Sequence, residues 1–229
     1  MAGWNLKASE GNQWEEILSN EEIIDKLQSF FSKKTTMKNL YKLTLLESLT
    51  IVSSTSKNCF KNIFFEVLKV FGEIYWELER TIKIKKTIYN GYSEISDQEK
   101  LIREIKETHF LKENIKYEEL NELIKNDYIE KTTIILKKNV LGALYNDFEG
   151  YIYFFDKKEE KLILNPSFLI YFKNNKNFIK RIISLRTVEF LKISKEYKNN
   201  LGELNFIVQD IEVNKNYYED IFMLLENER

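Results

Sequence analysis

The sequence predicts an α+β protein that is predominantly α-helical, a helical bundle with one small antiparallel β-hairpin sheet around 130–165. Three observations predict this class. The 229 residues include one proline and seven glycines, and 31% of them are charged, so few residues interrupt helices. Apolar residues recur at helical spacing along most of the chain. The segment 140–165 differs because its aromatic residues alternate as they do in a strand.

Apolar periodicity predicts helices in a first part of the chain, residues 1–90. These helices are expected at 12–31, 39–52 and 60–78. Serines and threonines after Val52 offer side-chain hydrogen bonds that compete with the second helix and end it. The third helix is apolar on most of its circumference, which indicates a central position. A charged stretch and the turn Asn90-Gly91 close this part.

The second part, residues 91–229, combines helices with the hairpin. Ser96 and Glu99 have the spacing of a capping box, which predicts a helix from there to Thr108. The β-branched run 132–135 and the segment 150–164 predict strands. Further helices are expected at 117–125, from Pro166, at 177–197 and near 216–226. The boundary between the parts is either a domain boundary or a loop within one continuous domain.

Several classes of function are excluded because the residues they need are missing. Cys59 is the only cysteine and His109 the only histidine, so Ser/His/Asp, Cys/His and histidine-based zinc sites have too few members. No GxxxxGK or GxGxxG phosphate loop occurs. We therefore expect no cofactor and no metal, and a binding protein rather than an enzyme.

The cellular location follows from two further absences in the sequence. No run of 18 or more apolar residues occurs, and the first residues lack a basic start followed by an apolar core. A lone cysteine forms no intrachain disulfide and fits a reducing compartment. These features predict a cytoplasmic protein with no membrane partner.

Charge is distributed in blocks, although the formal net charge is only −1. The net charges are −4 for 1–30, +5 for 31–61, +6 for 173–198 and −5 for 199–229. Such blocks steer an anionic partner to a local patch. The alternative is a solvated surface whose faces compensate one another, within one chain or between copies.

The basic block near the C-terminal end contains the candidate binding residues. They are Lys173, Lys176, Lys180, Arg181 and Arg186. The first three have i, i+3, i+7 spacing and share one face if the helix is continuous. Lysine and arginine on one helix face are typical of phosphate contact, so this segment predicts nucleic-acid binding. A solvated helix face is the alternative interpretation.

Acidic residues around the hairpin suggest a different alternative, a divergent metal-dependent nuclease. The candidates are Asp147, Glu149, Asp156 and Glu160, with Lys161 following the last. Paired carboxylates hold the metal ions of such enzymes. The same acids are expected in a polar turn without any catalytic role.

The segment Val140–Ile183 resembles part of the N-terminal helical region of bacterial proteins that end in an HNH endonuclease domain. The matching residues are Gly142-Ala143-Leu144-Tyr145, Gly150, Tyr153-Phe154-Phe155, Leu164-Asn165-Pro166 and Phe172. Shorter matches are Leu40-Tyr41-Lys42-Leu43, Leu45-Leu46-Glu47 and Ile74-Tyr75-Trp76. Together these pieces span roughly 38–196, and each one is short.

This resemblance implies a function in nucleic-acid recognition without the nuclease activity of the family. In the family a nuclease module follows the helical region and supplies histidines, whereas the 30 residues after Asn199 contain neither His nor Cys. The resemblance therefore implies a non-catalytic recognition module of a bacterial defence or restriction system, with DNA or a nuclease subunit as partner. A structural or protein-interaction subunit is the alternative.

Overall fold

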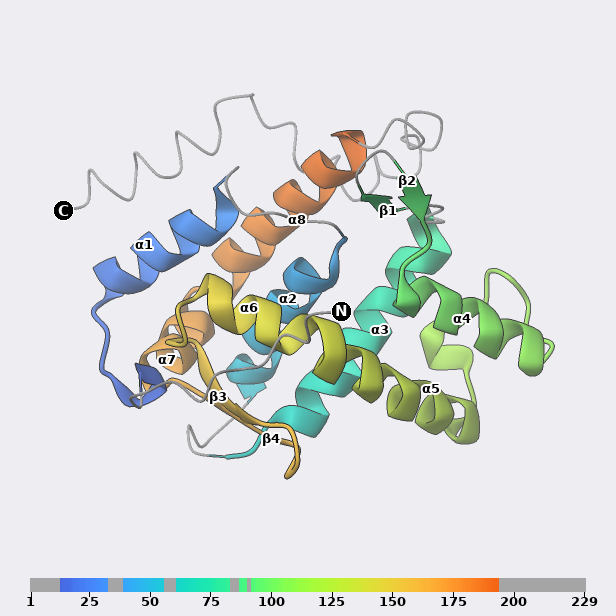
Figure 1. Ribbon diagram of the computed structural model, residues 1–229, viewed down its shortest axis with the longest axis horizontal. Coiled ribbons are helices and arrows are strands. Elements are labelled where there is room, and N and C mark those ends of the chain that lie inside the picture. The colour runs from blue at the N-terminus through green and yellow to red at the C-terminus, as the bar shows by residue number, and fades with distance from the viewer. Residues whose placement is uncertain (1–12, 33–38, 56–60, 83–86, 90–91, 194–229) are drawn as a thin grey trace.

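The computed structural model describes residues 13–32, 39–55, 61–82, 87–89 and 92–193, and shows a mainly helical α+β fold with antiparallel hairpins (Figure 1). The short helices are η1 (Gln13–Glu15), η2 (Tyr117–Glu119) and η3 (Leu136–Val140). The α-helices are α1 (Asn20–Phe31), α2 (Tyr41–Thr55), α3 (Phe64–Ile82), α4 (Asp97–Thr108), α5 (Glu122–Ile135), α6 (Leu141–Asp147), α7 (Pro166–Asn174) and α8 (Lys176–Ile193). The strands are β1 (Thr87–Tyr89), β2 (Tyr92–Glu94), β3 (Tyr153–Asp156) and β4 (Lys161–Leu164). The predicted fold class is confirmed.

Helix α2 is the central element, and α3, α7 and α8 all pack on it (Figure 1). It is buried on almost every side, and its buried residues include the hydroxyl-bearing Thr44, Ser48, Thr50 and Ser53. Ser53, Ser54 and Thr55 donate hydrogen bonds of 2.6–2.9 Å to backbone carbonyls three residues earlier. These bonds satisfy the hydroxyl groups inside the helix. The prediction that these residues end the helix at Val52 is therefore wrong by one turn.

Helices α3 and α5 approach each other closely at Gly72. A Cβ atom on Gly72 would lie 2.7 Å from the Cδ1 atom of Ile129, so only glycine fits there without a shift. The hydroxyl of Tyr128 donates to the Gly72 carbonyl at 3.1 Å, and the Tyr128 ring packs edge-on against Trp76. This contact joins the predicted central helix to the segment that follows α4.

The chain from Glu122 to Asp147 forms one rod, in which a π-helical turn, η3, joins α5 to α6 (Figure 1). The strand predicted at 132–135 is therefore wrong, and the first residues of the segment 140–165, which was expected to be strand-like, are helical. Asn121 caps α5 by accepting from the Ile124 amide at 2.9 Å. Thr132 is fully buried and accepts from Gln98 at 2.7 Å, so packing overrides β-branched propensity.

Two hairpins lie apart from each other at the edge of the helical body (Figure 1). The β3–β4 hairpin confirms the prediction, with Tyr153 opposite Leu164 and Asp156 opposite Lys161. The β1–β2 hairpin, in which Thr87 pairs with Glu94, was missed. An Asn-Gly dipeptide between short strands is a common hairpin signal, whereas Asn90-Gly91 was expected only as a turn that closes the first part of the chain.

The starts of α1 and α4 are set by side chains that cap the first turn of each helix. The capping box of Ser96 and Glu99 is confirmed. A second box, Ser19 with Glu22, starts α1 at Asn20 rather than near Asn12, because the Ser19 hydroxyl accepts from the Glu22 amide at 3.2 Å. The expected helix near 216–226 and Cys59 lie outside the described residues.

None of the helices in the described part of the chain combines the length and the apolar character needed to span a membrane.

Candidate nucleic-acid interface

The basic segment forms a corner between α7 and α8 rather than one continuous helix. Asn175 ends α7, and both its backbone amide and its side-chain amide donate to the Tyr171 carbonyl, at 2.9 and 3.0 Å. Helix α8 then begins at Lys176. The single face that i, i+3, i+7 spacing predicted therefore does not form, because Lys173 lies on a different helix from Lys176 and Lys180.

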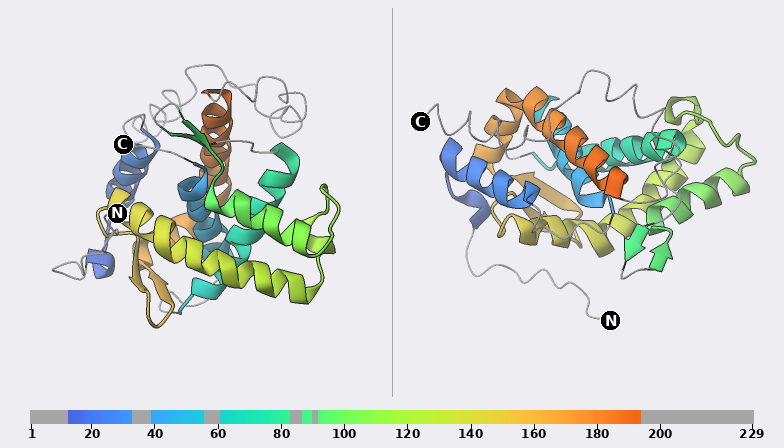
Figure 2. Two further views of the ribbon diagram at one scale, coloured as in Figure 1. Left: turned by 45° about the vertical axis from the view of Figure 1, so that its right-hand side comes forward. Right: turned by 90° about the horizontal axis from the view of Figure 1, so that it is seen from above.

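Helix α8 lies along the outside of the helical body and packs over α2 (Figure 2). Across Pro166–Ile193 the chain has six basic residues and one acid, Glu189, a formal net charge of +5. The corner therefore presents a local positive charge in a chain whose formal net charge is −1.

Two of the five candidate residues hold α8 in place. The Lys176 ammonium donates to the Ser54 hydroxyl at 3.0 Å, which joins α8 to the end of α2. Arg186 forms an ion pair with Glu189 and donates to the Ser32 carbonyl at 3.2 Å. Only 12% of the Arg186 side chain is exposed. Both residues stabilise the packing of α8, and both are half-buried.

The other three candidate residues lie at the surface. Lys173 and Arg181 are exposed. Lys180 keeps 41% of its side chain exposed, and its ammonium lies 3.9 Å from a Glu47 carboxylate oxygen. Burial raises the pKa of Glu47, and the nearby Lys180 opposes that rise. Asn174 and Asn177 are also exposed and add neutral hydrogen-bond donors, so the corner offers the groups that bind phosphate oxygens.

The four acids of the alternative nuclease have separate partners. Asp147 pairs with Lys42 at 2.6 Å, Glu149 with Lys26 at 2.9 Å and Glu160 with Lys137 at 2.9 Å. The Asp156 carboxylate accepts from two backbone amides of the hairpin turn, which lowers its pKa. Within the described ranges no three His, Cys, Asp or Glu side chains converge in a way that holds a metal ion. His109 is exposed at the end of α4, 3.9 Å from Asp127.

A buried polar cluster surrounds the start of α4. One carboxylate oxygen of Glu99 accepts from the Ser96 amide at 2.9 Å, while the other has no hydrogen-bond partner among the residues that the structure describes. Burial raises the pKa of Glu99 to about 7, and it raises the pKa of nearby Tyr75 well above its ordinary value. Both side chains are almost inaccessible to solvent, so no substrate reaches them directly.

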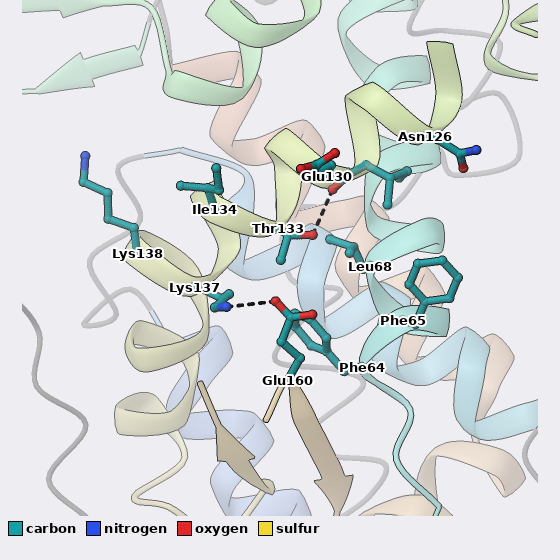
Figure 3. A pocket seen from close by; sticks show the side chains of 11 residues that line it. Phe64, Phe65, Leu68, Asn126, Glu130, Thr133, Ile134, Lys137, Lys138 and Glu160 are labelled. Atoms are coloured by element: carbon teal, nitrogen blue, oxygen red, sulfur yellow. Dashed lines mark hydrogen bonds and ion pairs between the residues drawn. The ribbon is translucent and has the colours of Figure 1, made fainter. Parts of the chain in front are cut away.

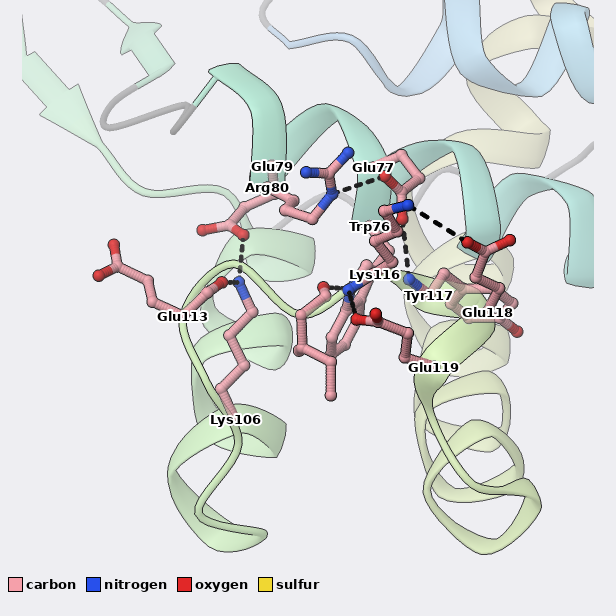
Figure 4. Close-up of polar contacts among 11 residues, drawn as sticks. Trp76, Glu77, Glu79, Arg80, Lys106, Glu113, Lys116, Tyr117, Glu118 and Glu119 are labelled. Carbon is pink, nitrogen blue, oxygen red and sulfur yellow. Dashed lines mark hydrogen bonds and ion pairs between the residues drawn. The ribbon is translucent and has the colours of Figure 1, made fainter.

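A second polar cluster fastens the loop after α4 to α3 (Figure 4). The Lys106 ammonium lies 2.8 Å from the Glu79 carboxylate and donates to the Glu113 carbonyl at 2.7 Å. The Trp76 indole donates to the Ile115 carbonyl at 2.9 Å, and Glu77 accepts from the Tyr117 amide at 2.8 Å. Each of these polar groups contacts another group of the cluster, so the cluster has a structural role.

A surface groove that no sequence pattern predicted lies between α3 and the rod formed by α5 and η3 (Figure 3). The groove has a volume of about 940 Å³. Its lining residues are Phe64, Phe65, Leu68, Asn126, Ile129, Glu130, Thr133, Ile134, Lys137, Lys138 and Glu160. The strand prediction for 132–135 placed Ile134 outside any helix. The sequence therefore did not show that Glu130 and Ile134 share one helix face.

No protein-family model matches the chain, and no curated protein or solved structure matches it either. The resemblance to the helical region of HNH-endonuclease proteins therefore stays a prediction from short motifs.

Proposed function

We propose that this chain is a non-catalytic nucleic-acid-binding module whose phosphate-binding surface is the α7–α8 corner. The observation that carries this proposal is the charge of the corner, which has six basic residues against one acid over Pro166–Ile193. Lys173, Lys180 and Arg181 supply the exposed cations. A nuclease-associated setting in bacterial defence or restriction, with DNA or a nuclease subunit as partner, is supported only by the short HNH-related motifs.

The arrangement of these cations favours backbone contact rather than base reading. Lys180 and Arg181 project from the first turns of α8, whereas Lys173 projects from the last turn of α7. Cations spread over a convex corner contact phosphates along a strand, and such contacts carry no sequence information. We therefore expect binding that is weakly sequence-dependent and strongly salt-dependent.

Fluorescence anisotropy with labelled DNA and RNA oligonucleotides tests the proposal. For the wild-type protein, affinity should fall by orders of magnitude between about 50 mM and about 200 mM salt. The double variant Lys173→Glu/Arg181→Glu removes two phosphate contacts. It should therefore bind more weakly and reduce the slope of log K against log salt by about 2.

A control variant separates local contacts from overall charge. Lys157→Glu/Lys158→Glu changes the net charge by the same amount at the β3–β4 turn, away from α8. It should leave the salt slope unchanged. The proposal is wrong if the wild-type protein fails to bind at the lowest salt, or if both double variants weaken binding equally.

A further inference from the structure

The groove between α3 and α5 exposes large apolar side chains, one of which, Phe65, has the Lys69 ammonium 4.5 Å from the centre of its ring. The exposed fractions are 55% for Phe65 on α3 and 65% for Ile134 on α5, and both side chains line the groove (Figure 3). Buried Phe64, Leu68 and Ile129 form its apolar base. An apolar groove with polar residues at its rim is typical of a protein interface.

The exposed face of the rod has a charge pattern that complements itself. Glu130, Ile134 and Lys138 follow one another at intervals of four residues and line the groove. Residues four apart in an α-helix form a ridge on its surface, as Glu130 and Ile134 do on α5, and Lys138 continues this ridge in the π-helical turn η3. Neither Glu130 nor Lys138 forms an ion pair with another residue of the described ranges. The ridge therefore has an apolar centre, with an acid on one side and a base on the other that form no ion pair among the described residues.

We infer that a second copy of this chain occupies the groove, as one half of a two-fold symmetric dimer. In an antiparallel arrangement with the axis near Ile134, Glu130 of each copy faces Lys138 of the other. The ridge of each copy then enters the groove of its partner, where Ile134 meets the apolar base. A two-fold interface requires one surface that is complementary to itself, and this ridge and groove satisfy that requirement.

The π-helical turn η3 contributes to this surface. It places Lys137 and Lys138 in adjacent positions with different roles, since Lys137 pairs with Glu160 at 2.9 Å on the hairpin. Lys138 stays exposed at the groove rim. Single π-helical turns are rare and occur frequently at functional sites. In this turn Lys137 contacts the hairpin, and Lys138 is placed to contact the second copy.

Sedimentation velocity over a concentration series, without nucleic acid, tests the apolar centre of the interface. The wild-type protein should pass from monomer to dimer in the micromolar range. Ile134→Ser should raise the dissociation constant by at least about tenfold, because it removes the central contact from both copies. Ile170→Ser on α7 is the control, since Ile170 is 60% exposed and lies outside the groove. This control should dimerise as the wild type does.

Charge reversal tests the symmetry of the interface. Glu130→Lys alone and Lys138→Glu alone each place like charges opposite one another, so each variant should be mainly monomeric at low salt. A mixture of the two variants restores both opposite-charge pairs and should form a mixed dimer.

Three outcomes would overturn the inference. They are a wild-type protein that stays monomeric up to high concentration, an Ile134→Ser variant that dimerises normally, and a mixture that forms no mixed dimer. Circular dichroism of each variant confirms that it is folded, since all the changed side chains are exposed.

Discussion

Phe110 has a backbone conformation that favours glycine, and its ring is 95% exposed. It follows the end of α4 with φ of 51°, while the next amide, of Leu111, donates to the Lys106 carbonyl at 2.9 Å. This pattern is common where a helix ends, and glycine usually occupies the left-handed position because other residues are strained there.

Phe110→Gly should therefore stabilise the protein by about 1 kcal/mol, because the substitution relieves backbone strain and removes almost no buried surface. Chemical denaturation checks this value. Phe110→Ala is the matched control, since alanine removes the ring but keeps the strain, and it should give little or no gain. Equal gains for the two variants would show that the exposed ring, and not the backbone, is the cause.

Glu99 is a buried carboxyl whose pKa is raised from 4.5 to about 7. The folded protein therefore holds the proton more tightly than the unfolded chain does. Below pH 4.5 the protonated Glu99 contributes as much as about 3 kcal/mol to the free energy of unfolding. This contribution is lost as the pH rises to about 7. Arg103 opposes the shift and Glu79 adds to it.

Glu99→Gln keeps the oxygen that accepts from the Ser96 amide but cannot ionise. At pH 8 this variant should be more stable than the wild type, and its free energy of unfolding should fall less between pH 5 and pH 7. Burial also raises the pKa of Glu47 and Asp147, so a smaller decline should remain. Urea denaturation at a series of pH values measures both effects. Parallel curves for the two proteins would mean that Glu99 does not titrate in this range.

At the scale of elements, Asn165 joins three segments. Its side-chain oxygen accepts from the Ser167 amide at 2.7 Å at the start of α7, while its side-chain amide donates to the Glu16 carbonyl at 2.9 Å. Its backbone amide donates to the Ile152 carbonyl at 3.0 Å. The prediction that Asn165-Pro166 starts a helix is confirmed, and the contact with the N-terminal segment is an addition from the structure.

Asn165→Ala should destabilise the protein by about 2 kcal/mol, because it removes the cap and leaves the Glu16 carbonyl without its donor. Asn165→Ser restores a capping oxygen and should recover part of the loss. Thermal unfolding of both variants measures these differences. A serine variant as unstable as the alanine variant would assign the whole effect to the contact with Glu16.

A local capping signal predicted the start of α4 correctly, whereas β propensity misassigned residues 132–135. The Ser96–Glu99 box depends on residues three apart, so it is visible without any tertiary contact. The β-branched run 132–135 was assigned to a strand from propensity alone. Within this run Thr132 accepts from Gln98 of α4, and one turn earlier Ile129 packs on Gly72 of α3; no local pattern shows that these residues lie there.

At the scale of the whole molecule, the two proposed surfaces are built from different helices. The α7–α8 corner packs on α2, whereas the groove lies between α3 and α5. A dimer through the groove would carry two basic corners, and linked sites bind a long nucleic acid more tightly than one site does. The two tests remain separate because the oligomeric state is measured without nucleic acid.

The candidate interface was only partly predictable. The sequence identifies five basic residues near the end of the described chain, but their number does not show which ones reach solvent. Lys176 and Arg186 are used inside the protein because Ser54 and Ser32 lie beside α8 in space, more than 100 residues away along the chain. Contacts between residues so far apart in the sequence leave no periodic pattern. From the sequence alone, Lys176 and Arg186 therefore look like exposed surface charges.

The sequence by itself determined the helical class, the β3–β4 hairpin, the capping box at Ser96 and the helix start at Pro166, because periodicity, capping and proline act between residues close in the chain. Tertiary structure decided the helical state of 132–147, the break at Asn175 that separates α7 from α8, and the groove with its ridge at Ile134. These features depend on which helices meet. Burial and shape complementarity between segments distant in the sequence decide which helices meet, and no local spacing encodes those contacts.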